Sequence, residues 1–138
     1  MKVLDPKVDV LRRLPSLAAV RRRDLASVAP LVEDLCVRAG VVVVHEGDLC
    51  HEVVLVLEGT AEVSVGGRVV GVVGPGDVLG DLAVREHLPH ATTVTATTNL
   101  HVLVAGPESH RTFVHHPVVV RHVAATLSDR LRRADTGA

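Results

Sequence analysis

The stretch "VLGDLAVREHLPHATTV", residues 78–94, combines residues that suit the binding of an anion. Gly80 lets the backbone approach a ligand closely because it lacks a side chain. Asp81 follows at the start of an expected short helix, whose free N–H groups favour a phosphate. The Asp81 carboxylate suits either a helix cap or a sugar hydroxyl, and His90, after Pro89, is placed to point back at the anion. Backbone amides, one cationic side chain and a carboxylate are typical of nucleotide binding, and a plain Gly-Asp turn is the alternative.

The region from about 36 to 105 predicts the β-structure that must position this stretch. Its β-branched runs alternate with glycine-containing turns such as Gly47-Asp48 and Gly66-Gly67, a pattern typical of short antiparallel strands in a sandwich or barrel. The expected strands lie within residues 41–44, 52–59, 61–65, 68–73, 92–98 and 100–105.

Residues from about 8 to 35 predict helices before the β region. Leucines recur at three-residue spacing over 11–17, and Asp24 is the expected cap of a further short helix. Pro15 and Pro30 divide this region into short pieces instead of one long helix.

Residues from about 107 to 133 predict a C-terminal helix pair, with Pro117 in the first turn of the second helix. An apolar stripe at helical spacing follows, and Arg130, Arg132 and Arg133 complement the C-terminal end of the helix dipole. The stripe, within residues 120–131, suits either a homodimer seam or packing on the chain's own β region. Its members are Val120, Val123, Ala124, Leu127 and Leu131.

Length and composition bound the protein class. The chain has 138 residues, of which 47% are hydrophobic, so we expect a single domain over 1–138 with a core of its own. The net charge of −1 provides no global basic field for nucleic acid, and the local arginine clusters are expected to be solvated helix faces.

Two cysteines, Cys36 and Cys50, are too few for a disulfide framework and lack metal-ligand spacing. We expect two buried thiols in a reducing compartment. No signal-peptide core and no apolar run long enough to span a membrane are found, so the expected location is the cytoplasm and no membrane partner is expected.

Enzymatic alternatives find little support. Nine histidines invite comparison with a small cupin-type metalloenzyme, but they are scattered, and no His-x-His cluster with a nearby carboxylate is present. No nucleophile elbow or phosphate-binding P-loop occurs, and no serine has a histidine partner by motif. We therefore expect no catalytic residues and no cofactor.

The order of these segments resembles the cyclic nucleotide-binding domain family, found in catabolite-activator-type regulators and cyclic-nucleotide-dependent kinases. The resemblance covers nearly the whole chain, from "LRRLPSLAAV" through "AGVVVVHEGDLCHEVVLVLEGTAEVSV" and "GPGDVLGDLAV" to the helix pair. It implies a mainly β fold, a jelly-roll-like double-stranded β-helix or β-roll, with N-terminal helices and a C-terminal helix pair.

The resemblance also implies a phosphate-binding cassette over residues 80–92. The family motif reads Phe-Gly-Glu-Leu-Ala, then Pro-Arg and small residues; it falls here on "LGDLA" and "LPHAT". Backbone amides near the start of the motif would hold the cyclic phosphate, and Asp81 would face the ribose hydroxyl. The residues that the resemblance assigns to the site are Gly80, Asp81, Leu82, Ala83, His90, Ala91 and Thr92.

Two departures from the family pattern bear on the ligand. Asp81 is one methylene shorter than glutamate, and His90 replaces an arginine that is always charged and donates two parallel hydrogen bonds. We expect weak cyclic nucleotide binding, or a degenerate module that acts through contact with a protein partner. Ala91 stands where cGMP-selective members often carry threonine, so cAMP is the expected ligand and cGMP the less favoured one.

The family also implies a regulatory role, in which the C-terminal helices move over the bound base. His122, Thr126 and Arg130 are polar candidates for the base contact, although each also suits an exposed face or a dimer face. DNA binding in the family needs a reader domain, and we expect no DNA-binding domain in this chain because no helix-turn-helix follows residue 133.

Overall fold

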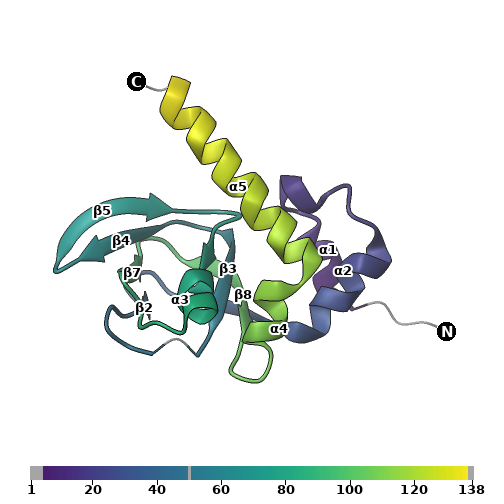
Figure 1. Ribbon diagram of the computed structural model, residues 1–138, viewed down its shortest axis with the longest axis horizontal. Helices are drawn as coiled ribbons and strands as arrows, with labels where there is room; N and C mark the ends of the chain where they lie inside the picture. The colour runs from purple at the N-terminus through teal and green to yellow at the C-terminus, as the bar shows by residue number, and fades with distance from the viewer. Residues whose placement is uncertain (1–4, 50, 137–138) are drawn as a thin grey trace.

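The computed structural model describes residues 5–49 and 51–136, with side chains described to residue 129. Two four-stranded antiparallel sheets form a roll, and helices lie at one side of it (Figure 1). The expected β-roll with N-terminal helices and a C-terminal helix pair is confirmed. In chain order the elements are α1 (Lys7–Leu11), η1 (Pro15–Leu17), α2 (Arg22–Val28), η2 (Ala29–Leu31), β1 (Glu33–Val37), β2 (Val42–Val44), β3 (Val53–Glu58), β4 (Ala61–Val65), β5 (Arg68–Val73), β6 (Val78–Leu79), α3 (Asp81–Glu86), β7 (Thr93–Ala96), β8 (Leu100–Ala105), α4 (His110–His115) and α5 (Pro117–Thr136).

The N-terminal helical region differs from its expected bounds. Strand β1 begins at Glu33, so the roll starts three residues before the expected 36. Asp24 does not cap α2, because that helix begins at Arg22 and Asp24 lies within its first turn. Leu11, Leu14 and Leu17 are buried, but only Leu11 lies in an α-helix, since Leu14 lies in a bend and Leu17 in the short helix η1.

The sheets pair in the orders β1-β8-β3-β6 and β2-β7-β4-β5. The sequence of β3 is a continuous apolar run because both faces of this strand are buried. Val53 and Leu55 face the core between the first sheet and the helices, whereas Val54 and Val56 face the core between the two sheets. The roll therefore has one apolar interior of its own and a second that holds the helices in place.

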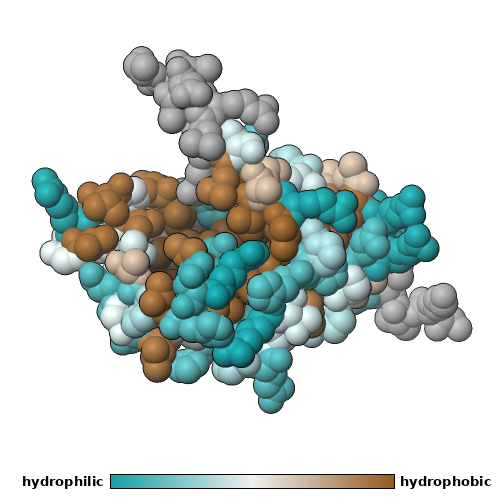
Figure 2. All heavy atoms as spheres, viewed as in Figure 1, coloured by the Kyte–Doolittle hydropathy of each residue, from teal (hydrophilic) through white to brown (hydrophobic). Residues whose placement is uncertain are grey.

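The hairpin of β4 and β5 lies at the outer edge of the second sheet. Its turn is Gly66-Gly67, with φ of 57° and 81°, the left-handed backbone that a two-residue hairpin turn requires. Val70 and Val72 of β5 are 59% and 65% exposed, and Figure 2 shows apolar side chains gathered over this hairpin.

Helix α5 buries a different face from the one predicted. Val118, Val119 and His122 are buried, whereas Val120 and Leu127 of the predicted stripe are exposed. Val123 of the stripe is half-buried and packs against the core between the first sheet and the helices, so the stripe is packed on the chain's own core only in part. The side chain of Leu131 and those of Arg130, Arg132 and Arg133 lie outside the described residues.

The thiol of Cys36 is exposed, so the expectation that it is buried is wrong. Its strand, β1, is at the edge of the first sheet, and residues 33–36 are all exposed. Cys50 lies outside the described residues. Within the described ranges, no helix has the length and apolar character needed to cross a membrane.

Candidate functional site

Gly80 begins the cassette in a conformation that other residues rarely adopt. Its φ is 89°, in the left-handed region, and it is the N-cap of α3. The Val84 N–H donates to the Gly80 carbonyl at 3.1 Å, which closes the first turn. The amides of Asp81, Leu82 and Ala83 precede that bond, so the helix supplies them with no partner of its own. The short helix expected after Gly80 is present.

The return segment of the cassette is fixed against the loop that follows β2. Leu49 and Pro89 form an isolated β-bridge. The His90 N–H donates to the Asp48 carbonyl at 2.9 Å, and the Gly47 N–H donates to the His90 carbonyl at 2.8 Å. These bonds hold His90 by its backbone at the rim of the roll. Ala91 is exposed and Thr92 is half-buried beside it.

The His90 side chain is half-buried, and burial lowers its pKa below the ordinary value of 6.5. The Asp48 carboxylate acts in the opposite direction with a smaller effect on the pKa. The imidazole is therefore mostly neutral near pH 7, which weakens any charge-assisted bond to a phosphate.

The predicted site residues are divided among three hollows, two of which are lined by residues of α3. Asp81 and Leu82 line a hollow of about 350 Å³ that faces α5. His90 and Asp48 line one of about 210 Å³ beside Val44 and Val54 of the roll. Ala83 lines a third, of about 490 Å³. The structure thus brings the cassette residues to one helix and its return loop, but the side chains of Asp81 and His90 open into different hollows.

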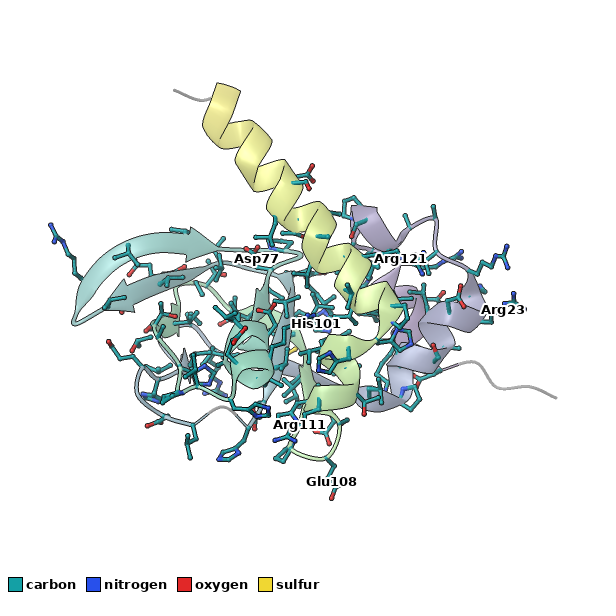
Figure 3. The ribbon with its side chains drawn as sticks, in the orientation of Figure 1. Arg23, Asp77, His101, Glu108, Arg111 and Arg121 are labelled. Atoms are coloured by element: carbon teal, nitrogen blue, oxygen red, sulfur yellow. The ribbon has the colours of Figure 1, made fainter. Side chains whose placement is uncertain are left out.

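Helix α5 contributes to the hollow that contains Asp81. Val123, Thr126 and Leu127 line its far wall, and Figure 3 places Asp77 beside α5 in the turn before β6. This hollow therefore lies between α3 and α5. Of the base-contact candidates, Thr126 faces this hollow and the side chain of Arg130 lies outside the described residues.

His122 is buried, contrary to its expected exposure. Its Nε2 lies 2.6 Å from the Gly76 carbonyl oxygen, and its Nδ1 is hydrogen-bonded to the Ser16 hydroxyl. A carbonyl only accepts, so the ring proton is on Nε2, and in the neutral ring Nδ1 accepts from Ser16. No sequence motif indicates this pair, because the two residues are 106 positions apart.

A second serine also has a histidine partner that no motif indicated. The Ser27 hydroxyl lies 2.8 Å from His116 Nε2 and donates to the Asp24 carbonyl at 2.6 Å. Because its proton goes to that carbonyl, the hydroxyl accepts from His116 and is not activated as a nucleophile. Across residues 5–49 and 51–129, no group of three or more His, Cys, Asp or Glu side chains is placed to hold a metal ion.

Comparison with known proteins gives the family context. The sequence model of the cyclic nucleotide-binding domain matches residues 35–116. A cAMP-dependent protein kinase regulatory subunit from Eremothecium gossypii is 39% identical over 101 residues, which cover 71% of this chain and 22% of the relative. The Pycsar effector protein XpPycTIR from Xanthomonas perforans is 35% identical over 95 residues, or 67% of this chain and 31% of that protein.

A solved structure of similar fold is that of a cAMP-binding acyltransferase from Mycobacterium smegmatis. The TM-score is 0.76 at 22% identity, and the match covers 92% of this chain and 41% of that one. This likeness concerns the fold alone. The chain spans only about a fifth to a third of the length of the two curated relatives above.

Proposed function

The chain belongs to the cyclic nucleotide-binding domain family, and on that premise we propose that it binds a cyclic nucleotide, cAMP in preference to cGMP, as a non-catalytic regulatory module. The single observation that carries the proposal is the left-handed Gly80 at the head of α3, which leaves three successive amides outside the helix's hydrogen-bond ladder. That arrangement suits a cyclic phosphate. The name of the Eremothecium gossypii relative, a cAMP-dependent kinase regulatory subunit, supports cAMP as the nucleotide.

The roles of the cassette residues follow from this placement. The amides of Asp81, Leu82 and Ala83 bind the phosphate oxygens, with the amide of Ala91 on the return segment. The Asp81 carboxylate accepts from the ribose hydroxyl. His90 supplies the side-chain contact to the phosphate, and it does so best when protonated.

The preference for cAMP rests on the residue after His90. Ala91 provides no side-chain hydroxyl at the position where cGMP-selective family members often carry one. The adenine base has no need of that hydroxyl, whereas a guanine would leave a hydrogen-bonding group unmatched.

The regulatory step uses α5 as a mobile lid. Leu82 of the cassette and Leu127 of α5 line the same hollow, so a phosphate that draws α3 inward changes the space available to α5. Coupling of this kind needs a ligand that binds the two positions of α5 with different affinity.

A degenerate module that acts through a protein partner is the second candidate, and two observations favour it. Burial keeps His90 largely neutral, and the side chains of Asp81 and His90 open into separate hollows. In that case the exposed apolar residues of the β4–β5 hairpin and of α5 are the contact surface.

Calorimetry with cAMP and cGMP, on the natural chain and on His90→Arg, tests the proposal. We expect weak binding of cAMP, weaker binding of cGMP, and a gain in cAMP affinity of about tenfold or more with arginine, because hydrogen bonds to charged groups are worth about 1.5–3 kcal/mol. His45→Arg is the matched control, since it adds the same charge beside the hollow of His90 without replacing that residue. Binding only after His90→Arg supports the degenerate module, and no binding by either chain refutes the cassette.

We also propose that the exposed stripe of α5 joins two copies of the chain. Val120 is 40% and Leu127 is 55% exposed, seven residues apart on one helix face. A second copy of the same helix covers such a stripe by parallel or antiparallel packing.

A further inference from the structure

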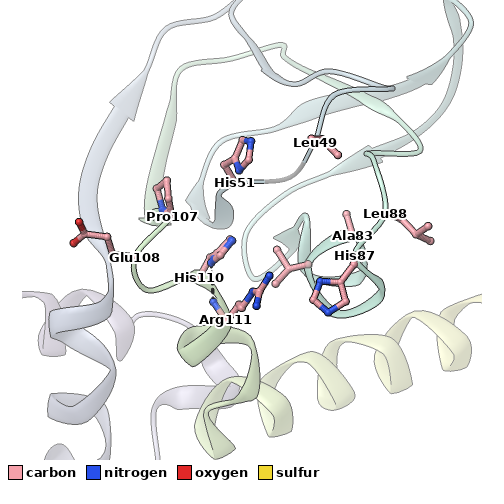
Figure 4. Close-up of a pocket in the computed structure, with 10 residues that line it drawn as sticks. Leu49, His51, Ala83, His87, Leu88, Pro107, Glu108, His110 and Arg111 are labelled. Carbon is pink, nitrogen blue, oxygen red and sulfur yellow. Dashed lines mark hydrogen bonds between the residues drawn. The ribbon is translucent and has the colours of Figure 1, made fainter.

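A hollow of about 490 Å³ lies near the C-terminal end of α3, between that helix, the loop before β3 and the start of α4 (Figure 4). Its size falls in the range of small-molecule sites, about 300–1,000 Å³. Leu49, Ala83, Val84, Leu88 and Pro107 form the apolar part of its lining. His51, His87, His110 and Arg111 form the nitrogen-bearing part.

The polar side of this hollow has no negative partner among the described side chains. Arg111 and the three histidines take part in none of the ion pairs formed within residues 5–49 and 51–129. Glu108 is the one acidic residue in the lining described, and its carboxylate points away from the imidazoles in Figure 4. The hollow therefore presents one fixed positive charge and several imidazole nitrogens, none of which is in an ion pair with a described carboxylate.

His110 has its proton on the nitrogen that remains available. The backbone N–H of Arg111 donates to His110 Nδ1 at 2.9 Å, so Nδ1 of the neutral ring is an acceptor. Nε2 therefore carries the hydrogen and is a donor. Since no described group accepts that hydrogen, an acceptor brought by a ligand satisfies it.

A cationic group lies close to His110. Burial, the guanidinium of Arg111 and the imidazole of His51 all lower the pKa of His110, in that order of effect, and no described acidic group is among the causes. Burial disfavours a charge of either sign, whereas the guanidinium of Arg111, which repels an added proton on His110, attracts an anion.

His87 lies at the mouth of the hollow in a strained conformation. Its φ is 54°, and it is the only non-glycine residue with positive φ among the described residues. It ends α3 where glycine is the usual residue, because a left-handed backbone there costs other residues about 1 kcal/mol. The ring at this position lines the hollow, which glycine would not do.

We propose that this hollow binds a small organic anion, whose carboxylate or phosphate head contacts Arg111 and His110 Nε2–H and whose apolar body packs on Leu49 and Leu88. Three imidazoles also suggest a metal, but no described group of three or more such side chains is placed to hold one. The hollow lies at the other end of α3 from Gly80 and does not contain Asp81 or His90, although it shares Ala83 with the cassette and Leu49 and His51 with the hollow of His90.

Titration of the full chain followed by amide NMR tests the site, with benzoate, benzyl alcohol and inorganic phosphate as the probes. We expect saturable shifts with benzoate at residues 83–88 and 107–111. Benzyl alcohol, which keeps the ring and lacks the charge, binds about tenfold more weakly or worse. If inorganic phosphate shifts the amides of the same residues, the anionic head group is sufficient for binding. If benzoate binds and inorganic phosphate does not, the apolar body is also necessary. Either result supports the site.

Arg111→Gln weakens benzoate binding by about tenfold, whereas Arg23→Gln, an exposed arginine on α2 far from the hollow, leaves it unchanged (Figure 3). Equal affinity for benzoate and benzyl alcohol, or equal effects of the two arginine variants, overturns the proposal. Cyclic nucleotide binding is measured separately in the same variants, so that loss of the cassette function is not mistaken for loss of this site.

His87→Gly distinguishes binding from a structural role. Glycine relieves the left-handed strain, so the free energy of unfolding is unchanged or raised, while the affinity for benzoate falls because an N–H donor is removed. A variant that is at least as stable and binds benzoate as well as the natural chain removes His87 from the site. A fall in affinity at full stability cannot be ascribed to damage to the fold.

Discussion

His122 Nε2 on α5 donates a 2.6 Å hydrogen bond to the Gly76 carbonyl, in the turn that precedes β6 and the cassette. The same ring is bonded through Nδ1 to the Ser16 hydroxyl on η1. One buried imidazole thereby ties the C-terminal helix to the N-terminal helices and to the roll. The region that would act as the lid is anchored at this point.

His122→Ala is expected to lower the free energy of unfolding by about 3 kcal/mol, because it leaves the Gly76 carbonyl without its donor and a cavity at the base of α5. Ser16→Ala removes only the Nδ1 partner and costs about 0.5–1.5 kcal/mol. Urea denaturation measures both. Equal losses of unfolding free energy in the two variants would show that the hydrogen bond to the Gly76 carbonyl adds nothing to stability.

Gly59 is expected to tolerate no side chain. A Cβ at this position would lie 2.3 Å from the Asn99 carbonyl oxygen, and φ is +95°. Gly59→Ala therefore costs about 3 kcal/mol or more, by strain and by overlap. Gly47→Ala is the control, since φ is +86° and nothing lies within 4 Å, so it costs about 1–2 kcal/mol of strain alone. Thermal unfolding of the two variants separates the effects.

The affinity for cAMP is expected to rise as pH falls from about 8 to about 6, because protonated His90 binds the phosphate better than the neutral ring. Burial lowers the His90 pKa in the free domain, so most of the rise occurs at the acidic end of this range. The gain is about tenfold for each unit by which the phosphate raises that pKa. Calorimetry at a series of pH values measures it, and His90→Arg abolishes the dependence. A flat profile in the natural chain excludes His90 from the phosphate contact.

Acidification is expected to destabilise the domain below pH 6.5. The pKa values of His90 and His110 are both lowered in the folded chain, mainly by burial, from an ordinary value of 6.5. Below pH 6.5 the unfolded chain therefore binds more protons than the folded chain. The contribution of these two histidines to the free energy of unfolding is fully present above pH 6.5, and it decreases as the pH falls toward their pKa values in the folded chain. Urea denaturation of the natural chain and of His110→Gln checks this; the variant has the shallower decline. Exposed His115→Gln is the control, and an equal effect there contradicts the assignment.

The stripe of α5 is expected to hold a dimer. Leu127→Glu places a charge on it and yields a monomer by light scattering, whereas the natural chain has twice that mass. Leu88→Glu is the matched control, because Leu88 is also 55% exposed but lies after α3. If the natural chain is a monomer at high concentration, the proposal that the stripe of α5 joins two copies is wrong.

Local patterns in the sequence were sufficient for β2, β3, β4, β5, β7 and β8, for the short helix after Gly80 and for the start of α5 at Pro117, whereas β1 and β6 were not predicted. These features depend on neighbours within a few residues: β-branched runs favour extended backbone, glycine accepts positive φ, and proline suits a first helical turn. The resemblance to the family added their order and so the β-roll. The sequence by itself thus determined most of the elements, and with the resemblance it determined their arrangement.

The tertiary structure alone decided which residues meet. It paired His122 with Ser16 and Gly76, exposed the thiol of Cys36 at a sheet edge, and buried Val119 of α5 in place of the predicted stripe. It also gathered His51, His87, His110 and Arg111 around one hollow. Contacts between distant segments depend on how helices dock against a sheet, and helical spacing specifies that a face is apolar without specifying what covers it.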